Sequence, residues 1–229
     1  MDNIRQLVKE LSQVRLEDVV DALDYVGVRD AGFMSNEIRP IYEGIKICGP
    51  AKTIHYVPSG ITLHYKTPEE YEKFRQEWYE SVCPAYAFKD VEPGDVLVAA
   101  AEGYEMGLWG SYMDLMAQAD GISGAVVDGG CRDRRECKLQ GAKVFARNIG
   151  RIELIGRFEL ESVNRTVSCG GVRVRVGDIV FGDDDGLAVV PIEHLKDVVK
   201  FAKEVWELDK KNRGIWYRKL NWPLDDTVI

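Results

Sequence analysis

The sequence predicts an α/β fold whose central strands run parallel. Between residues 93 and 149, apolar segments alternate with helix-forming segments, the order that builds β-α-β units. The apolar segments are continuous rather than alternating, which is typical of strands covered on both faces of a sheet. Short strands separated by glycine-rich turns at 166–191 then predict a compact second β layer, and a long helix at 192–212 closes the fold.

The N-terminal part is predicted to contain two helices and a strand. Apolar residues with helical spacing indicate helices at 3–12 and 16–27, and Gly27 is a good C-terminal stop for the second. Residues 46–57 have the alternation of a strand that a Gly-Pro pair breaks.

A further helix is predicted at 67–82, because Thr67 is a favourable N-cap, Pro68 suits the first turn and Glu70 completes a capping box. The core then follows in the order strand 93–103, amphipathic helix 107–121, strand 122–130, short helix 131–141 and strand 142–148. In the helix at 107–121, the residues expected to face the core are Leu108, Met113, Leu115, Met116 and Ala119.

Length and composition restrict the class of protein. With 229 residues and a formal net charge of −8, the chain fits one large domain and has no extended basic block, so we expect no nucleic acid partner. It has no apolar run of about eighteen residues and no signal-like N-terminus, so we expect no membrane association. Five scattered cysteines without a C-x-x-C pair indicate reduced thiols in a cytoplasmic protein, and the three single histidines do not suggest a zinc site.

Two loops are predicted to meet at the carboxyl edge of the parallel strands, where ligands of open α/β sheets collect. The first loop leads into a helix whose free N–H groups at Tyr112 and Met113 can bind an anion. The second loop follows the strand at 122–130. It carries Arg132, whose guanidinium suits a carboxylate, and Asp133, whose oxygens suit Mg²⁺ or Mn²⁺.

Glu136 is expected on the same helical face as Arg132 and Asp133, because it follows them at helical spacing. The spacing alone leaves a structural alternative open. Arg132 and Glu136 can form an exposed ion pair of small energetic consequence, and Asp133 is favourable beside any helix N-terminus.

Five segments of the chain, in order and spacing, resemble the RraA-like family. They are LEDVVDALDYVG, GPAKTI, PGDVLV, WGSYMDLMAQADGISGAVVDGGCRD and GDDDGLAVVP, and they extend from about residue 16 to 191. The family includes the class II 4-hydroxy-4-methyl-2-oxoglutarate/4-carboxy-4-hydroxy-2-oxoadipate aldolases and the regulator of ribonuclease E activity. The resemblance implies one swivelling-domain fold over residues 1–229, layered α/β/β/α, with a central mostly parallel sheet, a second small β layer and a C-terminal helix.

The aldolases of this family carry a glycine, a spacer, an Arg-Asp pair and an acid three residues after the aspartate, and these places are occupied here by Gly110, Arg132, Asp133 and Glu136. The resemblance therefore implies a divalent-metal lyase (Mg²⁺ or Mn²⁺) for a small 2-oxo acid, with Asp133 as the metal ligand. Arg132 would hold the pyruvoyl group of the substrate, and the N–H groups of Tyr112 and Met113 its carboxylate. A metal and a guanidinium both suit the negative charge of a pyruvate enolate.

One position departs from the family pattern. Directly after the glycine the aldolases have an acid, whereas this chain has Ser111, which hydrogen-bonds water but is not a base near neutral pH. Either Glu105 or Asp114 replaces that acid, or the chain performs altered chemistry such as decarboxylation, hydrolysis or tautomerisation. The aromatic-rich segment 60–90 is longer than in the family and is expected to be a lid over the site or an interface arm.

The resemblance also implies assembly into homotrimers or homohexamers with sites at subunit interfaces. In the family, an acid from a neighbouring subunit's C-terminal helix completes the site, and Glu204 and Glu207 are the candidates here. The C-terminal arm at 213–229 is rich in aromatic residues, which are typical of interfaces. The competing function is a regulatory binding protein without catalysis. Glu136 favours catalysis, because the regulators of the family lack this acid.

Overall fold

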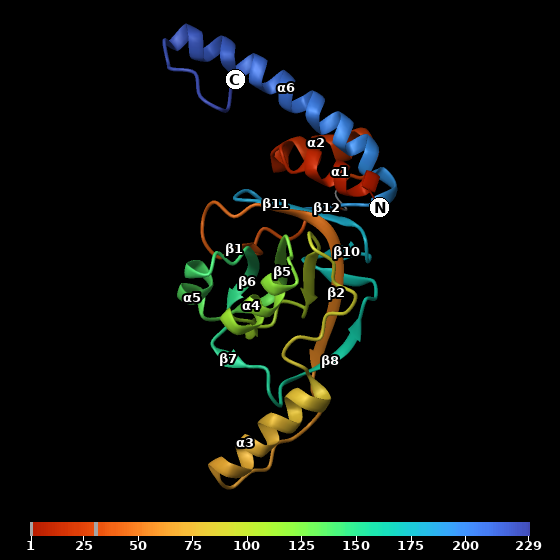
Figure 1. The fold of residues 1–229 in the computed structure, drawn as a ribbon, viewed down its shortest axis with the longest axis vertical. Helices are drawn as coiled ribbons and strands as arrows, with labels where there is room; N and C mark the ends of the chain where they lie inside the picture. Colours follow the sequence, from red (N-terminus) through yellow and green to blue (C-terminus); the bar gives the residue numbers. More distant parts are fainter. Residues whose placement is uncertain (1, 30–31) are drawn as a thin grey trace.

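The computed structural model describes residues 2–29 and 32–229 and has an α/β fold around one large sheet (Figure 1). In the described residues this sheet has ten strands, and its main path runs β1-β6-β5-β3-β2-β11-β12. The strands are β1 (Arg39–Pro40), β2 (Ile47–Pro58), β3 (Val96–Ala100), β4 (Met106–Trp109), β5 (Gly124–Cys131), β6 (Val144–Ile149), β7 (Ile152–Glu153), β8 (Phe158–Val163), β9 (Val167–Cys169), β10 (Val172–Val174), β11 (Ile179–Asp183) and β12 (Gly186–Val190). The helices are α1 (Asp2–Leu11), α2 (Leu16–Tyr25), α3 (Pro68–Glu77), the π-helix η1 (Trp78–Val82), α4 (Ser111–Ala119), α5 (Arg134–Leu139), the 3₁₀-helix η2 (Ile192–His194) and α6 (Leu195–Leu220).

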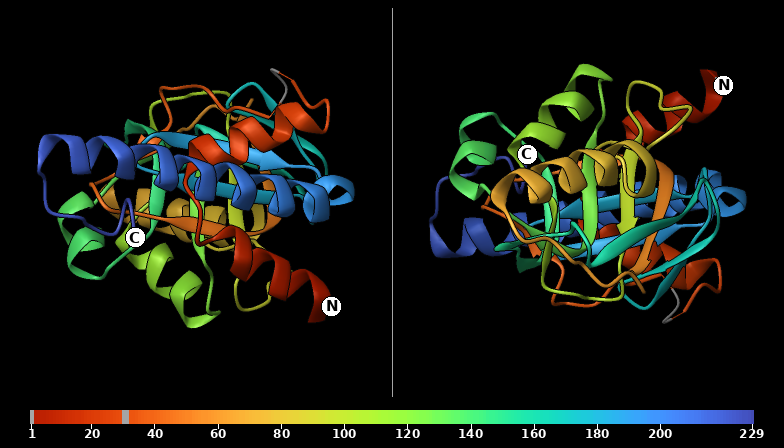
Figure 2. Two further views of the ribbon diagram at one scale, coloured as in Figure 1. Left: turned by 90° about the horizontal axis from the view of Figure 1, so that it is seen from above. Right: turned by 90° about the horizontal axis from the view of Figure 1, so that it is seen from below.

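Strands β2, β3, β5 and β6 form the parallel centre of the sheet, which confirms the predicted fold class. Every residue of β3 and β5 is buried, as their continuous apolar sequences predicted. Strands β9 and β10 form a separate two-stranded sheet. Helices α1, α2 and α6 pack a second core against β11 and β12, and they lie together over this side of the sheet (Figure 2). Helix α3 projects from the opposite end of the molecule (Figure 1).

Strand β2 is continuous, so the predicted break at its Gly-Pro pair is wrong. Gly49 and Pro50 pair with β11 in antiparallel orientation, and from Ala51 onward the strand pairs with β3 in parallel orientation. The Gly-Pro pair therefore marks a change of partner strand. A side chain at Gly49 would collide with the carbonyl oxygen of Gly94, which explains a glycine inside a strand.

The helix predicted at 107–121 begins later than expected. Residues Met106–Trp109 form β4, which pairs with β5 and β7, and α4 starts at Ser111. Leu115 and Ala119 face solvent rather than the core, whereas Met113 is buried. Pairing with buried strands outweighs the helical pattern of a short segment.

The C-terminal helix is longer than predicted. Helix α6 continues to Leu220, where Asn221 ends it in the left-handed conformation (φ 54°), so the arm at 213–229 is helical over its first part.

The helix predicted at 67–82 is confirmed as α3 and η1 together. In a capping box, the Glu70 carboxylate would accept from the N–H of the N-cap residue Thr67. Here it accepts from the N–H of Lys66, one residue earlier, so the capping box differs from the prediction. Among the described helices, none is both long and apolar enough to cross a bilayer.

Candidate active site

The two loops that carry the predicted site residues meet through the pairing of β4 with β5. Trp109 lies opposite Cys131, and the N–H of Arg132 donates to the carbonyl oxygen of Trp109 over 2.9 Å. The chain after each strand therefore enters the same cleft, which has a volume of about 390 Å³. Its lining includes Gly110, Tyr112, Met113, Arg132 and Asp133.

Asp133 is positioned by contacts on both sides of this cleft. It is the N-cap of α5 in the left-handed conformation (φ 56°). Its Oδ2 accepts from the Ser111 N–H (3.3 Å) and hydroxyl (3.2 Å) at the start of α4. A Cβ on Gly110 would lie 2.9 Å from the same oxygen, so this close approach requires glycine. The Asp133 side chain remains 35% exposed to the cleft.

Arg132 lies between two carboxylates. Its Nε is 3.4 Å from Asp133 Oδ1, and its Nη1 donates to Glu153 Oε1 over 3.2 Å. The arginine stem crosses Gly107, where a Cβ would lie 2.8 Å from Arg132 Cδ. Partial burial by itself lowers the pKa of Arg132, but the hydrogen bond to Glu153 and the charge of Asp133 outweigh burial and raise it. The guanidinium is therefore charged and held in one orientation.

Segment 60–90 contributes two polar side chains, and Ala85, to the same cleft. Arg75 on α3 and Tyr79 on η1 both line it, and the Arg75 guanidinium lies 5.6 Å from the centre of the Tyr79 ring. Arg75 Nε is also 3.9 Å from Glu153 Oε2. Burial raises the pKa of Tyr79, and the negative charge of Glu153 adds to this effect. The segment therefore borders the cleft, and its role as a lid or an interface arm stays a prediction.

Three polar side chains of the cleft were not identified from the sequence: Glu153, Arg75 and Tyr79. Glu153 lies in the two-residue strand β7, opposite Gly107 of β4, and no motif surrounds it. Arg75 and Tyr79 are one helical turn apart, but their pattern is that of any amphipathic helix. Only the three-dimensional arrangement brings them to Arg132.

The predicted carboxylates other than Asp133 do not line the cleft. Glu136 is exposed on α5, and in the described part of the chain it forms no ion pair with Arg132. The predicted common helical face does not form, because Arg132 precedes the helix and Asp133 is its N-cap. Glu105 is exposed in the loop before β4.

Asp114 is buried on the core side of α4. Its carboxylate accepts from Trp109 Nε1 (3.2 Å) and from Gln118 Nε2 (2.5 Å). Burial raises the pKa of Asp114, although these two hydrogen bonds oppose the effect. The side chain is therefore engaged in the protein interior, away from the cleft lining.

The residues of the cleft fit a divalent ion that retains several water ligands. In the described residues no group of three or more His, Cys, Asp or Glu side chains could enclose a metal. Mg²⁺, however, commonly binds through one or two carboxylates together with water and substrate oxygens. Asp133 is a partly exposed carboxylate directed into the cleft, and it provides one such ligand.

Comparisons with known proteins agree with this geometry. The family model described as RraA-like, Aldolase/RraA, matches residues 16–189. A Halalkalibacterium halodurans protein, provisionally named a 4-hydroxy-4-methyl-2-oxoglutarate aldolase, is 31% identical over 187 residues, which cover 81% of this chain and 77% of that protein.

Two solved structures share the fold over nearly the whole chain. An uncharacterized Pseudomonas syringae pv. tomato protein superposes with a TM-score of 0.74 at 23% identity and covers 98% of both chains. Streptomyces coelicolor RraAS2, described as an unusual member of the RNase ES inhibitor RraA protein family, has a TM-score of 0.73 at 25% identity and covers 91% of this chain and 96% of its own. Because the family model matches most of the sequence and the structure has the same fold, this chain belongs to the RraA-like family.

Proposed function

We propose that this protein is a divalent-metal-dependent lyase that cleaves a 2-oxo acid and releases pyruvate or a near relative. The observation that carries the proposal is the convergence of Arg132, Asp133 and the N-terminal turn of α4 on one cleft. The 31% identity to the H. halodurans relative adds support. Each of these groups suits one part of a 2-oxo acid whose carbon–carbon bond is breaking.

The chain's own residues would bind and polarise the substrate. The first-turn N–H groups of Tyr112 and Met113 bind its carboxylate at the positive end of α4. The Arg132 guanidinium donates to the 2-oxo oxygen, where negative charge grows as the bond breaks. Asp133 would hold Mg²⁺ or Mn²⁺, and the bound ion supplies Lewis-acid stabilisation of that same charge.

Glu153 is the group that we assign to proton transfer. Ser111 cannot act as a base, and neither Glu105 nor the buried Asp114 lines the cleft, whereas Glu153 does. In the cleavage of a 4-hydroxy-2-oxo acid, the hydroxyl proton passes to the Glu153 carboxylate. The electrons of the C3–C4 bond pass into the enolate, and Glu153 then returns the proton to C3. Atoms and charge balance over this cycle.

Assembly and location complete the proposal. We propose a homotrimer or homohexamer in the cytoplasm, built from a single domain with the lid at 60–90 and the C-terminal arm. The arm and the end of α6 support an interface because large apolar side chains are exposed there, including Trp216, Leu220, Trp222 and Leu224. In such an assembly, Glu204 or Glu207 of a neighbouring subunit would approach the site.

The test is pyruvate release from a panel of 4-hydroxy-2-oxo acids and oxaloacetate, with Mg²⁺, with Mn²⁺ and with excess chelator. We expect turnover only with metal, and Asp133→Ala should remove it without changing the circular dichroism spectrum. Metal-dependent turnover of oxaloacetate alone would indicate a decarboxylase. Turnover that persists in chelator would contradict the metal role. A lack of turnover of every substrate, together with inhibition of a ribonuclease, would support the competing regulatory function of the kind described for the S. coelicolor relative.

A further inference from the structure

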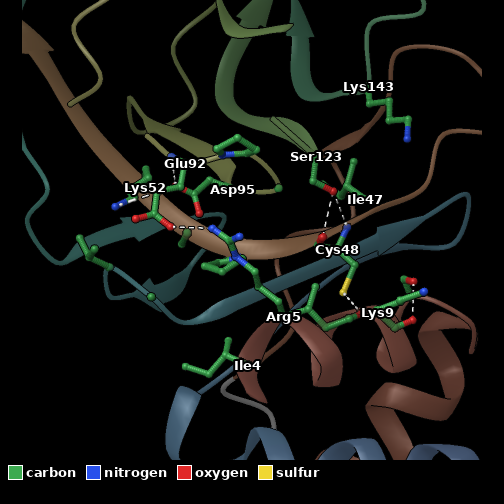
Figure 3. Close-up of a pocket in the computed structure, with 18 of the residues that line it drawn as sticks. Ile4, Arg5, Lys9, Ile47, Cys48, Lys52, Glu92, Asp95, Ser123 and Lys143 are labelled. Carbon is green, nitrogen blue, oxygen red and sulfur yellow. Dashed lines mark hydrogen bonds and ion pairs between the residues drawn. The ribbon is translucent and has the colours of Figure 1, made fainter. Parts of the chain in front are cut away.

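Figure 3 shows a second cavity, of about 650 Å³, beside α1. It is lined by α1 and by residues that directly precede parallel strands: Asp95 before β3, Ser123 before β5 and Lys143 before β6. The cleft with Arg132 and Asp133 instead follows the carboxyl ends of β4 and β5. A molecule in this cavity would therefore not contact the active-site cleft.

Positive charge is concentrated in this cavity although the protein as a whole is acidic. The formal net charge of the chain is −8, yet the basic side chains that line the cavity are Arg5, Lys9, Lys46, Lys52 and Lys143, against two acidic ones, Glu92 and Asp95. In Figure 3, Lys52 and Lys143 lie on opposite sides of the cavity, and Arg5 extends from α1 towards Glu92 on the side of Lys52. A concave surface with an excess of one charge raises the local concentration of ligands of the opposite sign.

Much of this positive charge is available to a ligand. Neither Lys9 nor Lys143 has an acidic partner among the described residues, and both are exposed. Arg5 pairs with Glu92 over 3.1 Å, but both side chains are more than half exposed, so the pair is weak and can be displaced. The Lys52 Nζ is 3.9 Å from Asp95, at the outer limit of an ion pair.

The remaining lining is apolar and already ordered. Ile4, Val8 and Pro93 contribute apolar surface beside the charged groups. At the floor, the Ser123 hydroxyl donates to the Cys48 carbonyl (2.9 Å) and accepts from the Cys48 N–H (3.2 Å), so this backbone needs no ligand to hold it. A preformed cavity of this size, with apolar walls and a few charged groups, is typical of small-molecule sites.

We propose that this cavity binds a small organic anion that carries an apolar group, at a site separate from the active-site cleft. Its carboxylate, phosphate or sulfonate would interact with Lys9, Lys143 and Arg5, and its apolar part would pack against Ile4 and Val8. The proposal does not depend on the lyase activity.

The probe for the test is the fluorescent aryl sulfonate 1-anilinonaphthalene-8-sulfonate, titrated into the intact full-length protein. We expect saturable binding that weakens with salt, because the contacts are partly ionic. The double variant Lys9→Glu/Lys143→Glu should raise the dissociation constant about tenfold, since two cavity charges are reversed. The matched control Lys89→Glu/Lys196→Glu changes the net charge equally at exposed lysines outside the cavity lining and should bind like the wild type.

Three results of the titrations would overturn the proposal: no saturable binding to the wild type, equal weakening in both double variants, or unchanged binding in the cavity variant when its circular dichroism spectrum is native. If the probe binds in the active-site cleft instead, the cavity variant will bind it like the wild type. Inorganic pyrophosphate and citrate are then tested as competitors that displace the probe. Displacement by either one supports an anion site, and comparison of the two shows whether the site prefers phosphate or carboxylate. Displacement by neither contradicts the proposal.

Discussion

The substitution Gly110→Ala tests whether the placement of Asp133 governs the proposed reaction. A Cβ at this position would lie 2.9 Å from Asp133 Oδ2 and 3.1 Å from Arg132 Cγ, whereas ordinary contacts of a Cβ begin at 3.4 Å. The carboxylate must therefore retreat by about 0.5 Å, which weakens its hydrogen bonds to Ser111. A displacement of about 1 Å in a catalytic group can cost about a hundredfold in rate, so we expect kcat/KM to fall about tenfold to a hundredfold.

The backbone itself should tolerate this alanine. Gly110 is extended, with φ −159° and ψ 176°, a conformation that any residue adopts. We therefore expect the unfolding temperature to change by no more than about 4 °C, the shift that about 1 kcal/mol causes in a chain of this size. The assay is metal-dependent pyruvate release at varied substrate concentration, beside thermal unfolding followed by circular dichroism. Gly60→Ala is the matched control, because a Cβ there meets no atom within 4 Å. Wild-type kinetics in Gly110→Ala would refute the argument.

Three further predictions concern the neighbouring side chains. Arg132→Lys should cost at least about 2 kcal/mol of transition-state stabilisation, because lysine cannot reproduce two directed N–H contacts. The loss is measured from kcat/KM, and full activity of the variant would contradict the role of Arg132 in binding the substrate. Glu153→Gln should lower kcat far more than it raises KM. The control Glu159→Gln, outside the cleft lining, should change neither constant. Burial raises the pKa of Asp114, so the native state loses stability as the pH rises above the ordinary pKa of an aspartate. Urea unfolding at a series of pH values should show Asp114→Asn gaining stability relative to the wild type as the pH rises, and a difference that stays constant with pH would disprove this.

The sequence predicted those parts of the fold that depend on local patterns. The buried strands β3 and β5 have continuous apolar sequences, and α2 ends before Gly27, which has φ +79° as its role as a stop requires. The segment Met106–Trp109 was assigned to a helix because its strand character comes from β5 and β7, which are distant in sequence. Strand β8 was missed for a similar reason, since its burial alternates weakly and its antiparallel pairing with β2 decides its conformation.

The same distinction applies to the site. Arg132, Asp133 and the start of α4 could be predicted together, because consecutive parallel strands place their following loops at one edge of a sheet. Glu153 could not, because β7 enters the cleft only through its pairing with β4. The expected position of Glu136 assumed that α5 begins before Arg132. With Asp133 as a left-handed N-cap, the helix starts at Arg134, three residues later than predicted, and Arg132 is free to turn towards Glu153.

The hydrogen bonds between Ser111 and Asp133 explain why this chain can have a serine where the family's aldolases have an acid. The Ser111 hydroxyl and N–H both donate to Asp133, so an acid at position 111 would place a second negative charge beside the carboxylate assigned to the metal. Glu153 instead approaches from β7 on the far side of Arg132, whose positive charge separates the two carboxylates. In the mechanism that we propose, Asp133 would hold the metal and Glu153 would carry the proton, so an acid on β7 would take the place of the acid that α4 lacks.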